Sequence, residues 1–147
     1  MVIMDYLLRS TKFNVKDLDA KALYERAYRE AILIDGNPSQ AKGRSLEEII
    51  VTCMYGQAAE LFMLTQGFAD DLRAYKDVIR PDGVPSEVKV TEHEGNVPYV
   101  LQRCNAAAAE AWRKYSPMLY IWINDKKSYD YRLYGMYEWN GKEFILQ

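Results

Sequence analysis

The 147-residue sequence predicts an α/β domain in which helices flank a mixed sheet, with an extra N-terminal helix and a C-terminal β-hairpin. Three observations predict this fold class. An apolar stripe at helical spacing follows Ser45, a turn sequence with alternating flanks surrounds Asp82, and an unbroken apolar run covers Met118–Ile123. A helix, a hairpin, a second helix and a buried strand are therefore expected in the middle of the chain.

The first two helices have clear sequence boundaries. An amphipathic pattern runs from about Asp17 to Ile34 and ends at a turn sequence containing Gly36 and Pro38. The next helix is expected to begin at Ser45, which forms a capping-box pair with Glu48, and to stop at Gly67.

Two polar residues interrupt the apolar stripe of this second helix. Gln57 and Glu60 fall within the stripe and not on its opposite face. A buried carboxylate is costly unless it is paired or bound to metal. Glu60 is therefore expected either to serve a metal site or to lie at the edge of the stripe, where it reaches solvent or an arginine.

The segment around Asp82 predicts a β-hairpin. Pro81 and Asp82 suit the centre of a type I turn, and Gly83 suits a left-handed closing position. Centring the hairpin on Asp82 sets Asp77 opposite Glu87. A register shift of one residue would instead put those two carboxylates on opposite faces.

Alternation along the second strand of the hairpin separates polar from apolar side chains. Glu87 and Lys89 share one face, Val88 and Val90 point into the core, and Tyr75 is expected opposite Lys89. Adjacent carboxylates repel unless a cation neutralises them, and their hard oxygens suit magnesium or manganese. The alternative is a solvated amphipathic hairpin whose charges have no catalytic role.

The rest of the chain continues the pattern of helices and strands. A proline follows the N-cap of the third long helix, and an Asn-Gly pair marks the last hairpin turn. The expected segments are a helix from Asn96 to about Tyr115, a buried strand at Met118–Ile123, a turn at 124–128, a strand at Tyr129–Trp139 and a final strand at 143–146.

Composition favours one domain with a core of ordinary size, because 49% of the residues are hydrophobic. Cys53 and Cys104 match no zinc or redox spacing and are expected as buried thiols of a cytoplasmic protein. Neither a signal peptide nor an apolar run long enough to span a bilayer is found, so no membrane partner is expected.

A net charge of −2 and a pI near 5.5 argue against a protein that coats nucleic acid by bulk electrostatics. This charge balance does not exclude local contacts with nucleic acid. Lys42 and Arg44 precede the helix start at Ser45, where backbone N–H groups favour phosphate, and Gln102 lies near the start of the next helix.

Taken together, Gly56-Gln57-Ala58-Ala59-Glu60 on a helix, Asp77 on one hairpin strand and Glu87-Val88-Lys89 on the next resemble the PD-(D/E)XK nuclease superfamily. The resemblance covers residues 45–123 and implies a restriction-endonuclease-like core. By the family pattern, Glu60, Asp77, Glu87 and Lys89 would be the site residues.

This resemblance divides one domain, residues 1–147, into an N-terminal helical extension at 1–44, the nuclease core at 45–123 and C-terminal strands at 124–147. Two features depart from the family pattern. The literal Pro81-Asp82 pair makes Asp82 the fallback for the motif aspartate. The strand that usually precedes the aspartate strand can only come from Phe68–Arg73, so it must be very short or merged with the next strand.

The resemblance also implies a mechanism. Asp77, Glu87 and the carbonyl of Val88 would hold Mg²⁺, which Mn²⁺ could replace, and Glu60 would complete the metal shell directly or through water. Lys89 would orient the attacking water and offset developing negative charge.

The expected function is a metal-dependent DNA endonuclease of homing or restriction type, acting as a homodimer so that two sites cut two strands. A branched-DNA junction resolvase or an exonuclease of the same fold is the alternative. A non-catalytic DNA-binding or inhibitor module is an alternative of another class.

Overall fold

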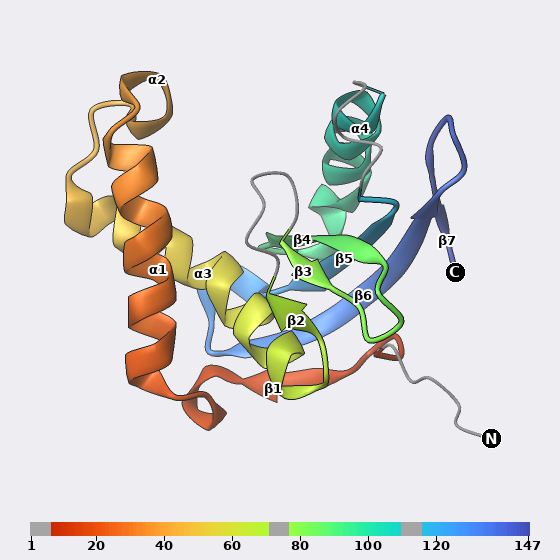
Figure 1. Cartoon of the computed structure of the whole chain (residues 1–147), viewed down its shortest axis with the longest axis horizontal. Helices are drawn as coiled ribbons and strands as arrows, with labels where there is room; N and C mark the ends of the chain where they lie inside the picture. Colours follow the sequence, from red (N-terminus) through yellow and green to blue (C-terminus); the bar gives the residue numbers. More distant parts are fainter. Residues whose placement is uncertain (1–6, 71–76, 110–115) are drawn as a thin grey trace.

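The computed structural model describes residues 7–70, 77–109 and 116–147 of the chain. The described residues form a mixed sheet of seven strands flanked by helices (Figure 1). The helices are α1 (Ala20–Asp35), α2 (Pro38–Ala41), α3 (Leu46–Thr65) and α4 (Val97–Ala108). The strands are β1 (Lys12–Asn14), β2 (Ala69–Asp70), β3 (Val78–Ile79), β4 (Pro85–Thr91), β5 (Met118–Ile123), β6 (Asp130–Trp139) and β7 (Phe144–Leu146).

The strand order is β1-β6-β5-β4-β3-β2, and β7 pairs with β6. Strands β2, β3 and β4 form an antiparallel meander, after which α4 connects β4 to the parallel strand β5. Strands β5 and β6 are antiparallel, as are β6 and β7. The predicted mixed sheet, its flanking helices and the C-terminal hairpin are thus all present.

Strand β5 lies at the centre of the core. All six of its residues are buried, as a continuous apolar run predicts for a strand covered on both faces. Tyr120 and Trp122 face the cluster packed against α3, whereas Leu119 and Ile121 belong to the cluster packed against α4. The sheet therefore has a face toward α3 and a face toward α4.

Helix α3 has the predicted boundaries. The Ser45 hydroxyl accepts from the backbone N–H of Glu48, and the Glu48 carboxylate accepts from the N–H of Ser45, which completes the capping box. At the other end, Gly67 adopts a φ of 99°, a left-handed conformation that only glycine adopts easily. Helix α1 begins at an Asp19 cap, slightly later than the sequence pattern suggests.

Two local features add detail to the predicted elements. The segment 1–44, expected as an N-terminal helical extension, also contributes β1, which pairs with β6. Three residues are too few to show alternation, and β1 is fixed by tertiary contacts: the Phe13 ring stacks on Phe62 and Tyr131. The second feature concerns Asn96, which is the N-cap of α4 as predicted, although its side chain makes no cap hydrogen bond and a 3₁₀ turn precedes the helix.

Candidate functional site

The β3–β4 hairpin has the predicted register. Val78 lies opposite Ser86 and Ile79 opposite Pro85. The paired residues end at Val78, so Asp77, predicted opposite Glu87, lies just before the strand. The backbone N–H of Asp77 also donates to the carbonyl of Ser86 at 3.2 Å, so Asp77 is held at the end of the strand pair. The position of Tyr75, predicted opposite Lys89, falls outside the described residues.

The turn of this hairpin places Asp82 at its tip. Gly83 has a φ of 90°, as predicted, and its N–H donates to the carbonyl of Arg80 at 2.7 Å. The guanidinium of Arg80 donates to both carboxylate oxygens of Asp82, at 2.9 and 2.8 Å. These hydrogen bonds lower the pKa of Asp82 to about 2. Asp82 therefore belongs to the structure of the turn.

The Asp77 carboxylate is fixed by the backbone of the opposite strand. Its Oδ2 accepts a hydrogen bond from the N–H of Val88 at 2.8 Å. In an extended strand the N–H and C=O of one residue point to the same side, so the carbonyl of Val88 faces the edge where Asp77 lies. Asp77 and the Val88 carbonyl therefore share one edge of β4, beside Glu87.

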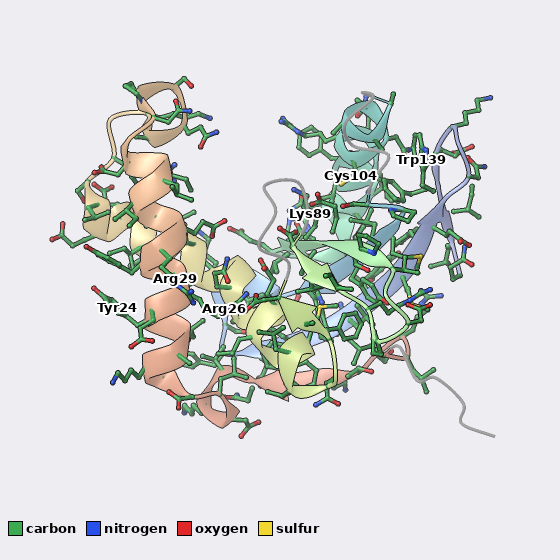
Figure 2. All side chains as sticks on the ribbon, in the orientation of Figure 1. Tyr24, Arg26, Arg29, Lys89, Cys104 and Trp139 are labelled. Carbon is green, nitrogen blue, oxygen red and sulfur yellow. The ribbon has the colours of Figure 1, made fainter. Side chains whose placement is uncertain are left out.

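Glu87 and Lys89 lie on the face of β4 toward α4, as the alternation predicts. Both line a cavity of about 140 Å³ that also borders Arg103 and Cys104 of α4 and Ser116. Figure 2 shows Lys89 on the side of β4 that carries α4, where Cys104 is also labelled.

The next side chain along β4 points the other way. Val88 is only 7% exposed and packs in the cluster that includes Ala58 and Met63 of α3. Val90 is partly buried against the same cluster. The predicted division of β4 into a polar and an apolar face is therefore confirmed.

Lys89 also borders a second and larger cavity, of about 390 Å³, between α3 and the C-terminal half of β4. Thr52 and Cys53 line it from α3, and Glu92 and Lys127 line it from the end of the sheet. The ammonium group of Lys127 lies 3.6 Å from the Glu92 carboxylate. Lys89 is exposed and stands between the two cavities, where it can reach a ligand in either.

Glu60 is buried and paired with an arginine. Its side chain is 11% exposed, and its Oε1 lies 3.4 Å from a terminal nitrogen of Arg26 on α1. The same guanidinium donates to the amide oxygen of Gln57 at 2.9 Å and to both carboxylate oxygens of Asp70 at 2.8 and 2.9 Å. Of the two expectations for Glu60, the described residues show the arginine contact.

The surroundings of Glu60 favour its neutral form. Burial raises the pKa of Glu60 to about 9, and the negative charge of Asp77 adds to the effect, while Arg26 opposes it. Glu30 and Asp70 raise the pKa further. The influence of Asp77 indicates that its carboxylate lies near Glu60.

Glu60 and Glu87 lie on opposite sides of β4. Within residues 7–70, 77–109 and 116–147, no group of three or more acidic, histidine or cysteine side chains is arranged to hold a metal ion. The reason lies in the strand. Val88 faces α3, so Glu87 points toward α4 while Glu60 lies on the α3 side and contacts Arg26.

The residues predicted to contact nucleic acid lie apart from this edge. The Arg44 guanidinium donates to the backbone carbonyls of Ala41 and Gln40, at 3.0 and 2.9 Å, and so ends helix α2. Lys42 is exposed beside it, and Figure 1 shows α2 at the C-terminal end of α1, away from β4. Gln102 is exposed on α4 but is not among the residues that line the cavity beside Glu87 and Lys89.

Sequence reasoning missed Arg26 and Asp70. Arg26 follows Leu23 by three residues, so it flanks the buried stripe of α1, and a buried Glu60 calls for a cation. That combination could have indicated an arginine partner, although 34 residues separate the pair. Arg103 is one of the charged residues of α4, and the cavity that it borders was not predicted from the sequence.

No protein-family model, no curated protein and no solved structure matches this chain. In the part of the chain that the structure describes, none of the helices is both long and apolar enough to cross a membrane.

Proposed function

We propose that this protein is a metal-dependent DNA endonuclease with a restriction-endonuclease-like core. The observation that carries the proposal is at β4, where the Asp77 carboxylate accepts a hydrogen bond from the Val88 N–H, between Glu87 and Lys89 in the sequence. Two carboxylates, a carbonyl and a lysine in this order are the groups that phosphodiester hydrolysis by the resembling family requires.

The arrangement of elements supports the same reading. Helix α3 is followed by the β2–β3–β4 meander, by α4 and by the parallel strand β5, which is the order expected from the resemblance. The strand expected before the aspartate strand exists as β2, and it is very short, with two residues. This order pairs β3, which directly follows Asp77, with β4, which contains Glu87.

The donor set fits a hard divalent cation. Asp77, Glu87 and the Val88 carbonyl would hold Mg²⁺ or Mn²⁺, because all three donors are oxygen atoms, the ligand type that these hard cations prefer. When bound, the ion would lower the pKa of a coordinated water and offset charge on the leaving oxygen. Glu60 contacts Arg26 and has a raised pKa, which favours its protonated form. A protonated Glu60 would add no negative charge beside Asp77.

Lys89 and Arg103 supply positive charge on the α4 side of the strand. Both border the cavity that contains Glu87, and Lys89 is exposed. An ammonium group two residues from Glu87 on the same face would orient the attacking water and offset the charge that develops on the phosphate oxygens. Arg103 would position the phosphate, since a guanidinium matches its geometry.

One observation favours a second candidate. The guanidinium of Arg26 already pairs with Glu60 and Asp70. These two carboxylates therefore need no metal ion to offset their charge. A non-catalytic DNA-binding module is the function consistent with that finding. Whether the protein cuts DNA separates the two candidates.

The test is a cleavage assay with linear, supercoiled and branched DNA in Mg²⁺ or Mn²⁺. Cleavage that needs one of these ions and stops with a chelator is the expected result. Reactions in Ca²⁺ and gel shifts on the same DNAs measure binding without cleavage. Binding to DNA with no cleavage in either metal would favour the non-catalytic module, and neither binding nor cleavage would overturn both.

The preferred DNA then distinguishes the nuclease classes. Selective cutting of branched DNA would identify a junction resolvase, and loss of nucleotides from ends would identify an exonuclease. Paired cuts on both strands of a linear duplex would support the homing or restriction type and its expected homodimer. Action on DNA inside the cell would also require the cytoplasmic location that the sequence favours.

A further inference from the structure

Helix α1 carries an apolar stripe on the side that faces away from the rest of the protein. Tyr24, Tyr28 and Ile32 are 50%, 41% and 43% exposed and follow one another at four-residue intervals. The two tyrosine rings lie 6.2 Å apart at an angle of 21°, so they form one continuous surface. Figure 2 shows Tyr24 on the outer side of α1 and Arg26 directed toward the sheet.

The fold does not account for this outer stripe. Helix α1 packs on α3 through a different face, where Leu23, Ala27 and Ala31 are buried. Residues four apart lie on one face of a helix, so the buried and exposed sets form two separate stripes. Exposed tyrosines at helical spacing are enriched at protein interfaces, because they bury apolar area and keep a polar tip.

The outer stripe is symmetric about Tyr28. Tyr24 and Ile32 lie four residues to either side of it, and Lys21 and Asp35 lie seven residues to either side. Seven residues are close to two helical turns, so both charges belong to the stripe. Both are exposed, and neither has an ion-pair partner within the described residues.

We propose that α1 is the contact surface for a second copy of this chain, with the two α1 helices antiparallel and Tyr28 near the twofold axis. In such an isologous contact, residues equally spaced from the axis meet. Tyr24 of each copy then packs on Ile32 of the other, and Lys21 pairs with Asp35 at both ends. A stripe with one positive and one negative end is complementary to an antiparallel copy of itself, and this self-complementarity favours a second copy as the partner.

The size of the stripe sets the expected strength. Sixteen residues of helix extend about 24 Å, so the helix pair alone would form an interface at the small end of specific contacts, with a dissociation constant on the order of micromolar. The dimer does not depend on nuclease activity, and its test needs no DNA.

Charge exchange tests the geometry. Light scattering and sedimentation should show a concentration-dependent dimer for the wild-type protein. Lys21→Asp places two carboxylates together at each end of the helix pair, and Asp35→Lys places two ammonium groups together, so each variant should dimerise at least tenfold more weakly. The double variant exchanges the charges and should recover the dimer. It also puts acid near the start of α1 and base near its end, where both suit the helix dipole.

A mixture of the two single variants gives the sharpest result. Each variant alone forms a dimer with like charges facing each other at both ends. In a mixed dimer, each aspartate of one variant faces a lysine of the other, so both ends form opposite-charge pairs. The mixture should therefore dimerise although each variant alone does so weakly. Circular dichroism checks that each variant is folded. A monomeric wild type at high micromolar concentration, or a mixture no better than its components, would overturn the proposal.

Disulfide cross-linking is a second test, and it detects a dimer even when the association is weak. Tyr28→Cys should form a disulfide-linked dimer on mild oxidation, because this position meets itself at the axis. Leu33→Cys is the matched control: Leu33 is 76% exposed on the same helix but lies off the stripe. The native Cys53 and Cys104 are buried and should contribute little. Equal cross-linking at both positions would contradict the assigned surface.

Discussion

The Asp77 carboxylate and the Val88 backbone N–H are joined across the hairpin by a hydrogen bond of 2.8 Å. This bond takes the place of a backbone partner at the end of the β3–β4 pairing. It also holds the carboxylate at the edge of β4, beside the Val88 backbone. One side chain therefore has a structural role and a candidate catalytic role, and substitutions can separate them.

Asp77→Asn is expected to preserve the hairpin and abolish cleavage. The amide oxygen can still accept from Val88, but the charge needed to hold a divalent cation is lost. Asp77→Ala should also be inactive, and it should lose about 1 kcal/mol of stability because the Val88 N–H loses its partner. Chemical denaturation and cleavage assays on both variants check this. An active Asp77→Asn protein would remove Asp77 from the site.

Asp82→Asn should keep cleavage within a few-fold of the wild type. Asp82 sits at the turn tip and pairs with Arg80, which lowers the pKa of Asp82 from 3.8 to about 2. Its stabilising effect is present above about pH 4 and disappears as the pH falls through about 2, so the variant should be slightly less stable at neutral pH and equal near pH 2. Thermal melts at both pH values measure this. Loss of cleavage here, with activity retained in Asp77→Asn, would make Asp82 the motif aspartate.

Lys89→Ala should depress single-turnover cleavage by a factor on the order of 100 or more and leave stability nearly unchanged. The side chain is exposed, so its removal leaves no core cavity, whereas its charge would act mainly in the transition state. Gel shifts in Ca²⁺ should show little change in DNA affinity. Lys142→Ala, in the turn between β6 and β7, is the control for losing one exposed charge. A Lys89→Ala enzyme within a few-fold of wild type would leave the nuclease proposal without its central residue.

Glu60→Gln should change how stability depends on pH. The pKa of Glu60 is raised from 4.5 to about 9 by burial and by Asp77, so between these values the folded protein retains a proton that the unfolded chain releases. Glu60 therefore makes the free energy of unfolding of the wild type fall as the pH rises through this range. Glutamine lacks this pH dependence, so the variant should gain about 1–3 kcal/mol relative to wild type between pH 5 and pH 8. Urea unfolding across this range measures the difference, and parallel curves would contradict the raised pKa.

Arg26→Met should destabilise the protein by about 2–4 kcal/mol, because it leaves Glu60, Asp70 and Gln57 without their shared donor. Arg26→Lys should recover only part of this loss, since an ammonium group cannot reproduce the fork that contacts three side chains. Equilibrium unfolding of the two variants provides the comparison. Near-wild-type stability of Arg26→Met would show that this buried network is not a structural requirement.

The elements that were predicted well are those with local signals. The capping box at Ser45, the left-handed Gly83 and the apolar run of β5 each lie within a few residues of sequence, and the structure has all three. The hairpin register follows from the same kind of signal, because the turn residues fix which positions of β3 and β4 meet. The pairing of Val78 with Ser86 was therefore predictable, as was the burial of Val88.

Long-range contacts were not predictable in this way. Strand β1 is three residues long and exists because Phe13 packs on Phe62 and Tyr131. The burial of Glu60 was expected from its helical stripe, but its contact with Arg26 depends on how α1 packs across α3. No pattern within one segment encodes the angle and offset of two helices.

Local sequence signals were sufficient for the order of elements, for the register of the β3–β4 hairpin, and for the polar face that Glu87 shares with Lys89. Tertiary packing was needed to establish which helix covers each face of β4, and this packing separates Glu60 from Glu87 and joins Glu60 to Arg26. The physical reason is distance along the chain. Turn and strand geometry follow from neighbouring residues, whereas the environment of a buried carboxylate depends on side chains that only packing brings together.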